Sequence, residues 1–583
     1  MQAAEKDTMA KTFDVAIVGG GPGGSTLGGL IKKYRPDWTV FIAEREKFPR
    51  DHVGESLLPH IGPVLDELGA WNKVEAAGFP VKIGATFLWG KDPDLWDFNF
   101  IPPLNFPNTQ RPGSFEGVRR MTAFQVDRAV YDDILLRHAE ELGCDVREGT
   151  AVREIIKTGD RIDSLKLSDG ESLTARWYID ASGDAGVVRK SMGVEIECPT
   201  ALKNVAFWDY WENTAWADTI GVGGTRIQII SVSFGWLWFI PLGATRTSLG
   251  LVCPAAYYKQ AGKSGEELYC DAIAESPRIS ELIRGGTRMG DLRSRKDWSY
   301  LAQRQSGENW FLVGEAGGFA DPILSAGLTL THLGARELAY TLFALSDNAH
   351  DAQWLTEQYG ENQRRRIRQH MRFAEFWYAA NGQFTDLMEY CRTIARESGL
   401  AMTAKQAWAW LAQGGFANDV IGQAGIGGYS LSEMNQVTQR FLDEDLKWHA
   451  SDRNVFKLNL LGAESSRIPI YHRGQITAVE CLSRSGKRLP LVGFYELLTK
   501  CLKRSSDIET IVQTLAATVQ KQFQAAEQQA MFLQAMQVLE VMVAEGWVKA
   551  SLDPKRPRLG LASPRIGELI RPHVDLSSAG TRA

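Results

Sequence analysis

The sequence has few cysteines, no long apolar run and no marked excess of one charge. Seven cysteines stand among 583 residues without a Cys-x-x-Cys pair. This spacing indicates neither a disulfide framework nor a metal site. The seven positions, which we expect to carry free thiols, are Cys144, Cys198, Cys253, Cys270, Cys391, Cys481 and Cys501.

No apolar segment approaches the roughly 20 residues that span a bilayer. The longest runs, such as Trp236–Leu242, have the length of a strand. The first residues, Met1–Lys11, are polar and lead directly into an expected strand, without the charged and apolar regions of a signal peptide. We therefore expect a cytoplasmic protein.

The formal net charge is −5 and the isoelectric point is near 6.1. This balance gives no reason to expect nucleic acid or a membrane surface as a partner. The length allows two to four domains at roughly 100–200 residues each.

A glycine-rich turn follows the first expected strand. Asp14–Val18 is mostly apolar, as in a parallel strand, and the next residues are Gly-Gly-Gly-Pro-Gly-Gly before an expected helix. Such a turn lets the backbone approach a pyrophosphate, while the helix N-terminus offers unpaired N–H groups. The expected contacts are Gly19, Gly21, Pro22, Gly23, Gly24 and Ser25.

A second expected strand, Thr39–Ala43, ends in Glu44 with Arg45 beside it. An acidic residue about 20 residues after the glycine turn accepts ribose hydroxyls in dinucleotide-binding folds. The turn and the acid together predict a dinucleotide site.

One tryptophan-rich stretch, Phe234–Pro241, has the sequence Phe-Gly-Trp-Leu-Trp-Phe-Ile-Pro. It follows the glycine turn and precedes a second Gly-rich turn, Gly314–Pro322, which comes after the apolar segment Trp310–Val313. On its own the stretch fits a buried strand equally well. The three motifs together resemble the flavin-dependent halogenases, within the superfamily of FAD-dependent aromatic hydroxylases.

The resemblance implies that Trp236, Trp238, Ile240 and Pro241 belong to the catalytic machinery. In that family the two indoles form a wall that keeps an organic substrate away from the reactive edge of the flavin. A flavin behind such a wall is expected to oxidise something small, such as halide.

The resemblance also implies further FAD contacts. Arg128 opens an expected helix and is either such a contact or a solvated helix charge, and Glu315 stands where relatives carry Asp. The implied contacts beyond the first turn are Arg50, Glu55, Ser56, Arg128, Asp297, Gly314, Glu315, Asp321, Pro322 and Gly327, of which Asp297 could be a covalent attachment point.

The residues after Asp321 lead into an expected helix, whose first N–H groups can hold an anion without a charged side chain. The resemblance places halide at Ser325, Ala326 and Gly327. The alternative is that these residues only pack on the flavin.

Lys82 lies in an expected strand within Gly78–Gly90, a segment that resembles the one bearing the essential lysine of the family. A buried lysine can hydrogen-bond hypohalous acid or form an N-halo amine. The alternative is a surface lysine on an edge strand.

Leu324 stands where halogenases of free tryptophan usually carry Glu. The better match is to relatives that act on phenols, pyrroles or carrier-bound acyl groups, including the chloramphenicol-pathway halogenase, whose Asp-Trp-Ser-Tyr resembles Asp297–Tyr300. We therefore expect an electron-rich aromatic or a carrier-bound acyl substrate.

Only one complete phosphate-binding motif is present, so reduced FAD is expected to come from a separate NADH- or NADPH-dependent flavin reductase. The implied reaction uses reduced FAD, O2 and chloride or bromide to form hypohalous acid, which Lys82 presents to the substrate. The alternatives are a flavin hydroxylase, a reductase of the geranylgeranyl type, and a flavin-binding sensor without catalysis.

The C-terminal part is less informative. Arginines at 364, 365, 366, 368 and 372 form either a solvated face or a docking site for an acidic carrier protein. Trp408 and Trp410 either line a substrate cavity or fill a core. Strands at Ser466–Tyr471 and Gln475–Cys481, followed by three helices, resemble a winged-helix unit, without a basic recognition helix for DNA.

The predicted fold class is α/β (α+β): a Rossmann-like three-layer FAD-binding domain with a β-sheet subdomain on the substrate side and a mainly helical C-terminal region. The expected divisions are a polar segment at 1–12, the FAD-binding domain at 13–345 with its substrate-side sheet at about 75–125 and 195–300, a helical region at 346–435, a winged-helix-like cap at 436–550 and a partly unstructured tail at 551–583.

Overall fold

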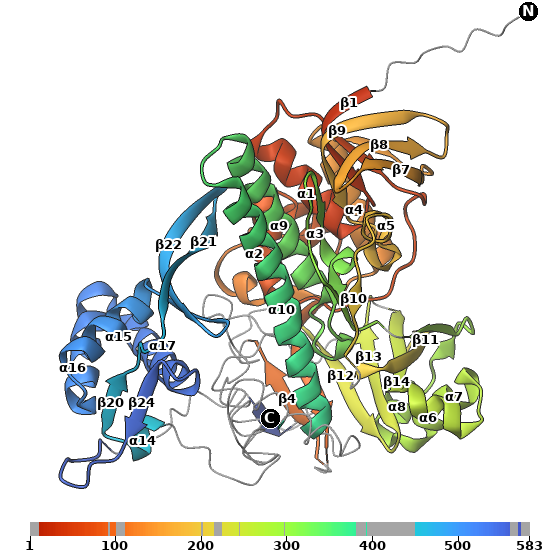
Figure 1. The fold of residues 1–583 in the computed structure, drawn as a ribbon. Helices are drawn as coiled ribbons and strands as arrows, with labels where there is room; N and C mark the ends of the chain where they lie inside the picture. The colour runs from red at the N-terminus through yellow and green to blue at the C-terminus, as the bar shows by residue number, and fades with distance from the viewer. Residues whose placement is uncertain are drawn as a thin grey trace, which may run out of the picture.

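Two large sheets and a smaller C-terminal unit make up the described part of the chain (Figure 1). The computed structural model describes residues 11–90, 94–100, 111–199, 202–214, 224–243, 245–296, 298–380, 392, 449–559 and 570–572. Asp297, Trp408 and Trp410, for which the sequence suggested roles, lie outside the described residues.

The first sheet has a parallel core, which the apolar runs of its strands predict, because both of its faces are covered. The strand order is β6-β2-β1-β9-β8-β7, and β18 also pairs with β9. The strands are β1 (Lys11–Val18), β2 (Val40–Ala43), β6 (Asp145–Arg147), β7 (Val152–Thr158), β8 (Arg161–Leu167), β9 (Ser172–Asp180) and β18 (Trp310–Leu312).

Three helices pack together over this sheet: α1 (Pro22–Tyr34), α4 (Arg128–Glu141) and α9 (Gly327–Ser346). Helix α4 begins at Arg128 because Asp127 caps it, its carboxylate accepting the N–H of Ala129 at 3.0 Å. The antiparallel strands β7 and β8 extend the sheet at one edge. Three shorter helices in this part are α2 (Gly62–Leu68), α3 (Trp71–Ala76) and α5 (Val187–Ser191).

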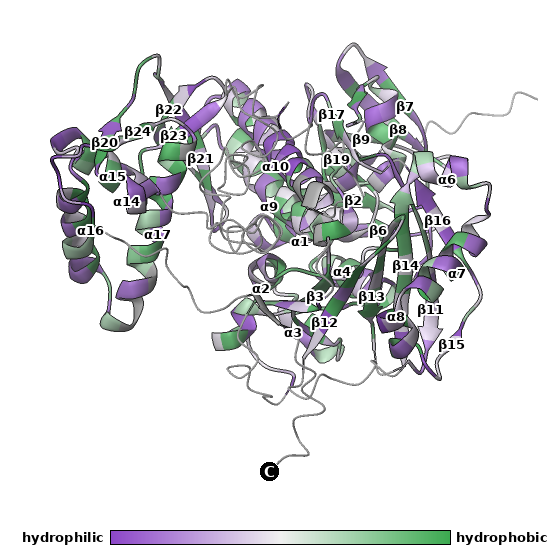
Figure 2. Ribbon diagram, turned by 90° about the horizontal axis from the view of Figure 1, so that it is seen from below, coloured by the Kyte–Doolittle hydropathy of each residue, from purple (hydrophilic) through white to green (hydrophobic). Residues whose placement is uncertain are grey.

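The second sheet has ten strands in the order β15-β11-β14-β13-β12-β3-β4-β25, with β16 on β11 and β5 on β3. Its strands are β3 (Val81–Leu88), β4 (Trp96–Asn99), β5 (Ala123–Phe124), β11 (Asn204–Glu212), β12 (Thr225–Val232), β13 (Gly235–Pro241), β14 (Arg246–Pro254), β15 (Thr287–Arg288), β16 (Arg293–Lys296) and β25 (Ile570–Pro572). Figure 2 shows several of these strands, including β13 and β14, in the hydrophobic colour.

Strand β13 is buried on both faces. One face carries Trp236, Trp238 and Ile240, which pack into an aromatic cluster. The other face carries Leu237 and Phe239, which join the hydrophobic core that also includes the first sheet. The alternation of side chains along a strand produces this division.

Helices α6 (Ala255–Ala261), α7 (Gly265–Glu275) and α8 (Pro277–Leu282) follow β14. Helix α7 has a complete capping box between Ser264 and Glu267. A three-stranded sheet of β10 (Ile196–Glu197), β17 (Tyr300–Ala302) and β19 (Gly318–Phe319) is the third sheet of this part.

Helix α10 (Ala352–Ala380) packs along α9 and runs from the C-terminal unit to the aromatic face of the second sheet. In that unit β22 packs against α9, and Figure 1 shows β21 and β22 beside α10. Its elements are α14 (His449–Asp452), β20 (Val455–Leu458), β21 (Glu464–His472), β22 (Gln475–Arg484), β23 (Lys487–Pro490), α15 (Gly493–Arg504), α16 (Ile508–Gln522), α17 (Ala525–Ala544) and β24 (Val548–Ser551).

The tail expected at 551–583 to be partly unstructured contributes a strand to the second sheet. Its short strand β25 pairs antiparallel with β4, Ile570 opposite Phe98 and Pro572 opposite Trp96. A proline is tolerated in a strand at the sheet edge, where its missing N–H is not needed. This pairing could not be predicted from the sequence, because a three-residue strand carries no periodicity.

The predicted fold class is confirmed, and the predicted strands and helices of the C-terminal unit are present with shifted ends. The six cysteines among the described residues are free thiols, as expected. Within the described residues, we find no helix that is both long and apolar enough to cross a bilayer.

Candidate active site

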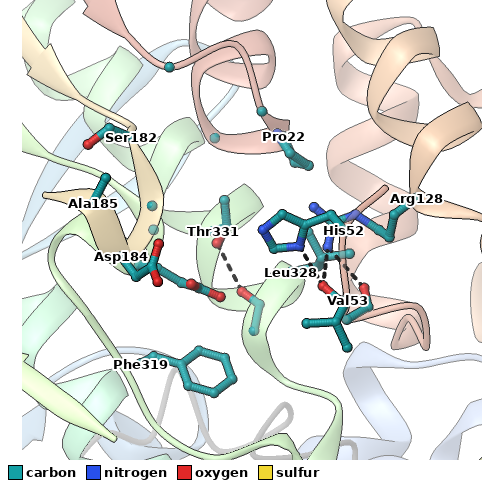
Figure 3. Close-up of a pocket in the computed structure, with 18 of the residues that line it drawn as sticks. Pro22, His52, Val53, Arg128, Ser182, Asp184, Ala185, Phe319, Leu328 and Thr331 are labelled. Carbon is teal, nitrogen blue, oxygen red and sulfur yellow. Dashed lines mark hydrogen bonds between the residues drawn. The ribbon is translucent and has the colours of Figure 1, made fainter. Parts of the chain in front are cut away.

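A cavity of about 640 Å³ lies between the loops of the first sheet and the aromatic face of the second. Figure 3 shows residues from several segments around it, with Pro22 on one side and Phe319 on the other. Its walls combine the glycine turn of β1–α1, the segment 50–56 and the strand β13. The motifs that are distant in sequence therefore meet at one cavity.

The glycine turn forms one end of the cavity. Gly19 has a φ of +108°, and a Cβ there would lie 2.4 Å from the Ala181 carbonyl oxygen, so only glycine fits. Gly21, Pro22 and Gly23 line the cavity at the start of α1, where helix N–H groups have no intrahelical partner. This end suits a phosphate group.

Glu44 also lines the cavity, and its carboxylate is held by the backbone. Its Oε2 accepts the N–H of Gly20 at 2.7 Å, and its Oε1 accepts the N–H of Glu46 at 2.9 Å. The carboxylate thus braces the glycine turn, while Arg45 and Arg50 line the cavity beside it.

Arg128 is buried, which rules out the solvated helix charge. It makes a two-pronged ion pair with Asp132, at 2.7 and 2.9 Å, and donates to the carbonyls of Val53 at 2.9 Å and Gly54 at 3.1 Å (Figure 3). Burial opposes its charge, but Asp132 raises the pKa of Arg128. Arg128 therefore fixes the loop that carries Glu55 as well as facing the cavity.

Glu315 faces the cavity and pairs with Arg295 at 2.9 Å. Burial acts against its ionisation, but Arg295, His52 and Arg128 together outweigh burial and keep the pKa of Glu315 below its ordinary value. The carboxylate is thus ionised on the cavity wall. The ion pair with Arg295 fixes the position of this side chain.

Trp236, Trp238 and Ile240 line the opposite end of the cavity. Trp236 and Trp238 have ring centres 6.0 Å apart, and each indole N–H is used: that of Trp236 donates to the Tyr378 hydroxyl at 3.1 Å, and that of Trp238 to Ser248 Oγ at 3.1 Å. Because both rings are anchored by packing and a hydrogen bond, they form a rigid wall.

Asp321 serves this wall instead of the cavity. Its carboxylate accepts from the Tyr378 hydroxyl at 3.0 Å, from the Trp298 indole at 3.4 Å and from the N–H of Ile323 at 2.9 Å. Burial raises the pKa of Asp321 to about 6, against these hydrogen bonds. Of the two neighbouring residues expected to contact the flavin, Pro322 lines the cavity and Asp321 does not.

Glu55 is a further acidic residue of the cavity. It lines the cavity, its Oε1 accepts the Tyr210 hydroxyl at 2.8 Å, and its Oε2 has no partner among the described residues. Burial raises the pKa of Glu55 to about 7, against hydrogen bonds from Tyr210 and Ser248. Since Ser248 also accepts from Trp238, Glu55 is connected to the wall.

The start of α9 forms a further part of the cavity. Ser325 and Gly327 line it, while Ala326 is buried behind them. Ser325 has a φ of +56°, and this turn directs the first N–H groups of a 20-residue helix into the site. The arrangement can accept an anion.

Lys82 is buried in β3 and does not line the cavity. It stands opposite Thr225 of β12 and Ala123 of β5, with its Nζ 5.6 Å from the centre of the Phe100 ring. It makes no hydrogen bond or ion pair with any described residue. Burial lowers the pKa of Lys82 to about 7, so the neutral amine is readily available.

A family model described as Tryptophan halogenase matches residues 14–112 and 105–407, which is more than half of the chain. The chain belongs to this family. The flavin-dependent halogenase resemblance noted in the sequence is thereby confirmed.

Several curated halogenases resemble this family member. The Tryptophan 2-halogenase of Chondromyces crocatus is 36% identical over 324 residues, covering 54% of this chain and 58% of that protein. Flavin-dependent halogenase armH4 of Armillaria mellea is 32% identical, covering 57% and 65%. The 1H-pyrrole-2-carbonyl-(peptidyl-carrier protein) chlorinase of Pseudomonas fluorescens is 29% identical, covering 65% and 86%. The matches span less than two thirds of the first two relatives.

Solved halogenase structures share the fold. The myxobacterial chondrochloren halogenase CndH, described as a variant of FAD-dependent halogenases, is 27% identical with a TM-score of 0.57, covering 74% of this chain and 97% of that one. The flavin-dependent halogenase CmlS is 24% identical with a TM-score of 0.69 and covers 93% of this chain and 96% of that one. The CmlS match extends to nearly the whole chain, so the C-terminal region shares in the likeness of fold.

Most of the residues that the sequence singled out line this cavity. Among the described residues, the predicted residues that line it are Gly19, Gly21, Pro22, Gly23, Glu44, Arg45, Arg50, Glu55, Ser56, Arg128, Trp236, Trp238, Ile240, Gly314, Glu315, Pro322, Ser325 and Gly327. Those that do not line it are Gly24, Ser25, Lys82, Pro241, Asp321 and Ala326. Gly24 and Ser25 support the turn from behind, since Ser25 Oγ donates to the Gly20 carbonyl at 2.7 Å.

The sequence missed several residues of this site. Tyr378, from α10, and Tyr210 and Ser248, from β11 and β14, hold the tryptophan wall and Glu55. Arg295 holds Glu315. No motif marked these residues, because their partners lie far away in the chain. Trp298, which donates to Asp321, does lie inside the Asp-Trp-Ser-Tyr segment noted in the sequence.

The residues present fit FAD. The turn at Gly19–Gly23 leaves room and free N–H groups for a pyrophosphate, and Glu44 stands beside it. The cavity continues from there to the tryptophan wall, so it offers room for both halves of a dinucleotide. Arg45 and Arg50 add positive charge near the phosphate end.

Proposed function

We propose that this chain is a halogenase that uses reduced FAD, O2 and chloride or bromide. The observation that carries the proposal is a single cavity with a dinucleotide cradle at one end and the Trp236–Trp238 wall at the other. Two curated relatives are named as a tryptophan 2-halogenase and a flavin-dependent halogenase. A hydroxylase needs its organic substrate beside the flavin, where this wall stands.

FAD is the cofactor we assign to the cavity. When bound in reduced form, it supplies the electrons with which O2 is converted to an oxidant strong enough to turn halide into hypohalous acid. The glycine turn, Glu44 and Arg50 would hold its phosphate and ribose part, and Glu315, Pro322 and Gly327 would lie toward its other half. The protein contributes binding, orientation and exclusion of water.

We assign the halide to the start of α9. The N–H groups near Gly327 are the positive end of a 20-residue helix and reach the cavity. The apolar neighbours Phe319 and Ile323 also line this place and weaken the competition from water. No charged side chain is required there.

We propose that hypohalous acid passes from the cavity to Lys82 past the segment that contains Ser56 and Gln125. Ser56 lines the cavity and pairs through its backbone with Gln125. The two residues before Gln125, Phe124 and Ala123, pair with Val81 and Lys82. Ser56 Oγ and the Gln125 amide are buried without partners among the described residues. Unpaired buried polar groups suit the passage of a small polar molecule.

Lys82 is the group that we propose delivers the halogen. As a neutral amine it can take the halogen from hypohalous acid, forming an N–halogen bond and releasing water, and then pass the halogen to an electron-rich carbon. The role is supported by its burial and by the absence of a carboxylate partner among the described residues.

The substrate we propose is an electron-rich aromatic or a carrier-bound acyl group. Leu324 stands at the position where halogenases of free tryptophan usually carry Glu, which argues against free tryptophan. The relative from Chondromyces crocatus is named for tryptophan and that from Pseudomonas fluorescens for a carrier-bound pyrrole, so both classes belong in a screen.

A separate flavin reductase is the partner we propose for the supply of reduced FAD. The chain has one glycine-rich phosphate-binding motif of the complete kind, and the described cavity is built around it. We also propose that the protein works in the cytoplasm, where such reductases are found.

The test avoids the unknown substrate. Purified protein is mixed with chemically reduced FAD, O2 and chloride or bromide, and hypohalous acid is trapped with a diffusible halogen acceptor read by mass spectrometry. Halide-dependent halogenation of the acceptor above a free-flavin control is the expected result. Rapid oxidation of NADPH by the protein alone, without trapped halogen, would overturn the proposal and favour a hydroxylase or reductase.

A further inference from the structure

A second cavity, the basic groove, lies between α10 and the sheet of β21–β23. Its volume is about 620 Å³, within the range of small-molecule sites. It shares no lining residue with the active-site cavity. The basic groove is lined by Gln358, Glu361, Arg364, Arg365, Arg368, Gln369, Arg372, Ser466, Arg467, Ser483, Ser485, Gly486, Lys487 and Arg488.

Positive charge dominates the basic groove. Seven of its lining residues are Arg or Lys and one, Glu361, is acidic, in a chain whose formal net charge is −5. Figure 2 shows the hydrophilic colour on α10, the helix that supplies four of the arginines. Like charges gathered in a concave surface repel one another and attract anions. The arginines of α10 are therefore not simply a solvated helix face.

Among the described residues, two carboxylates beside the basic groove each pair with two of its arginines. Glu361 pairs with Arg365 at 3.8 Å and also with Arg488. Glu197 pairs with Arg364 at 3.3 Å and with Arg368 at 3.5 Å.

Some donors in the basic groove lack an acceptor. Arg364 Nε and Arg488 Nη1 are buried without a hydrogen-bond partner among the described residues. An unpaired buried N–H is costly, and an oxygen-rich anion can supply the missing acceptors. The hydroxyl groups of Ser466, Ser483 and Ser485 add further donors at the same place.

We propose that the basic groove binds a small ligand bearing phosphate groups, at a site distinct from the FAD cavity. Guanidinium groups match phosphate because their planar fork makes two parallel hydrogen bonds to its oxygens. Arg368 and Arg467 keep much of their surface open to an incoming ligand, with 43% of the Arg368 side chain exposed. The site joins the C-terminal unit to α10, the helix that also carries Tyr378.

The test uses the full chain saturated with FAD, so that the dinucleotide site is filled. Pyrophosphate is titrated by calorimetry into this protein and into the double variant Arg368→Gln/Arg467→Gln. The matched control is Arg161→Gln, an exposed arginine of β8 whose side chain is 50% exposed. We expect saturable binding that weakens at least about tenfold in the double variant and is unchanged in the control.

Three results would overturn the proposal. Pyrophosphate does not bind, or the control variant weakens binding as much as the double variant, or a phosphate-free polyglutamate peptide binds the groove more tightly than pyrophosphate. The last result would mark the groove as a docking surface for an acidic protein. Because binding is measured without turnover, the outcome does not depend on the halogenase activity proposed above.

Discussion

At the scale of single residues, the position of Lys82 is the most informative. Lys82 lies in a buried strand and has no carboxylate partner among the described residues. Keeping its ammonium group charged there costs free energy of folding. Proteins retain such groups mainly where chemistry needs them. The burial of Lys82 therefore supports a role in catalysis and costs the fold some stability.

We expect Lys82→Met to lower substrate halogenation and to raise the stability of the fold. Hypohalous acid should still be formed and trapped, while halogenation of a substrate identified by screening falls at least about a hundredfold. At pH 7 the free energy of unfolding should rise, by up to about 4 kcal/mol, because the buried amine no longer has to lose its proton. Denaturant titration and product analysis test both parts.

The matched control is Lys166→Met, on the exposed edge of β8, where the side chain is 51% exposed. It should change neither stability nor activity noticeably. Retained substrate halogenation in Lys82→Met would remove Lys82 from the mechanism.

The pKa of Lys82 gives stability a definite pH dependence. Its pKa is about 7 in the folded chain, below the ordinary value of 10.5, so the unfolded chain binds more protons between these values. The stability of the wild type should therefore rise from pH 7 toward pH 10, relative to Lys82→Met, and the gap between the two should close. An NMR titration of labelled Lys82, with a midpoint near 10, would contradict this.

At the scale of elements, α10 and β13 are coupled. The Tyr378 hydroxyl of α10 accepts from Trp236 and donates to Asp321, and the Trp377 ring stacks on Phe87 with ring centres 5.0 Å apart. The wall of the active site is thus fixed by a helix that follows it by more than a hundred residues. A change in α10 should reach the wall.

We expect Tyr378→Phe to loosen the tryptophan wall. Removing the hydroxyl leaves the Trp236 indole and the Asp321 carboxylate each without one buried partner, at about 1–3 kcal/mol each. Hypohalous acid should then escape more often, so the ratio of product to reduced FAD consumed falls several-fold while FAD affinity is kept. Product yield per flavin oxidised is the measurement.

Tyr359→Phe is the control on the same helix. Its hydroxyl donates to the Leu312 carbonyl at 2.6 Å, away from the wall. It should cost similar stability but leave the yield per flavin unchanged. An equal loss of yield in both variants would mean that general loosening of α10 is responsible.

At the scale of the whole molecule, the end of the chain returns to the active-site sheet. Strand β25 covers the edge of β4, and β4 pairs with β3, which carries Lys82. An uncovered strand edge invites pairing with other molecules. Strand β25 therefore protects the edge of the sheet that holds Lys82.

Deletion of residues 560–583 should expose the β4 edge. We expect a lower Tm and concentration-dependent association in light scattering, whereas deletion of 573–583 alone should have little effect because β25 is kept. A monomeric protein of unchanged Tm after the longer deletion would show that this strand is dispensable.

The sequence by itself determined the features that depend on local backbone chemistry. The turn at Gly19–Gly24, the capped start of α4 and the Trp-x-Trp-x-Ile-Pro strand follow from residues that are neighbours in the chain, and so they were predictable. The family resemblance followed from the same short motifs.

Only the tertiary structure decided what depends on distant partners. Asp321 turns toward Tyr378 and away from the cavity, Arg128 is held by the loop at Val53, and the tail joins the sheet as β25. The basic groove exists only because β21–β23 pack beside α10. Each of these contacts joins segments far apart in sequence, and a pattern of neighbouring residues carries no record of such packing.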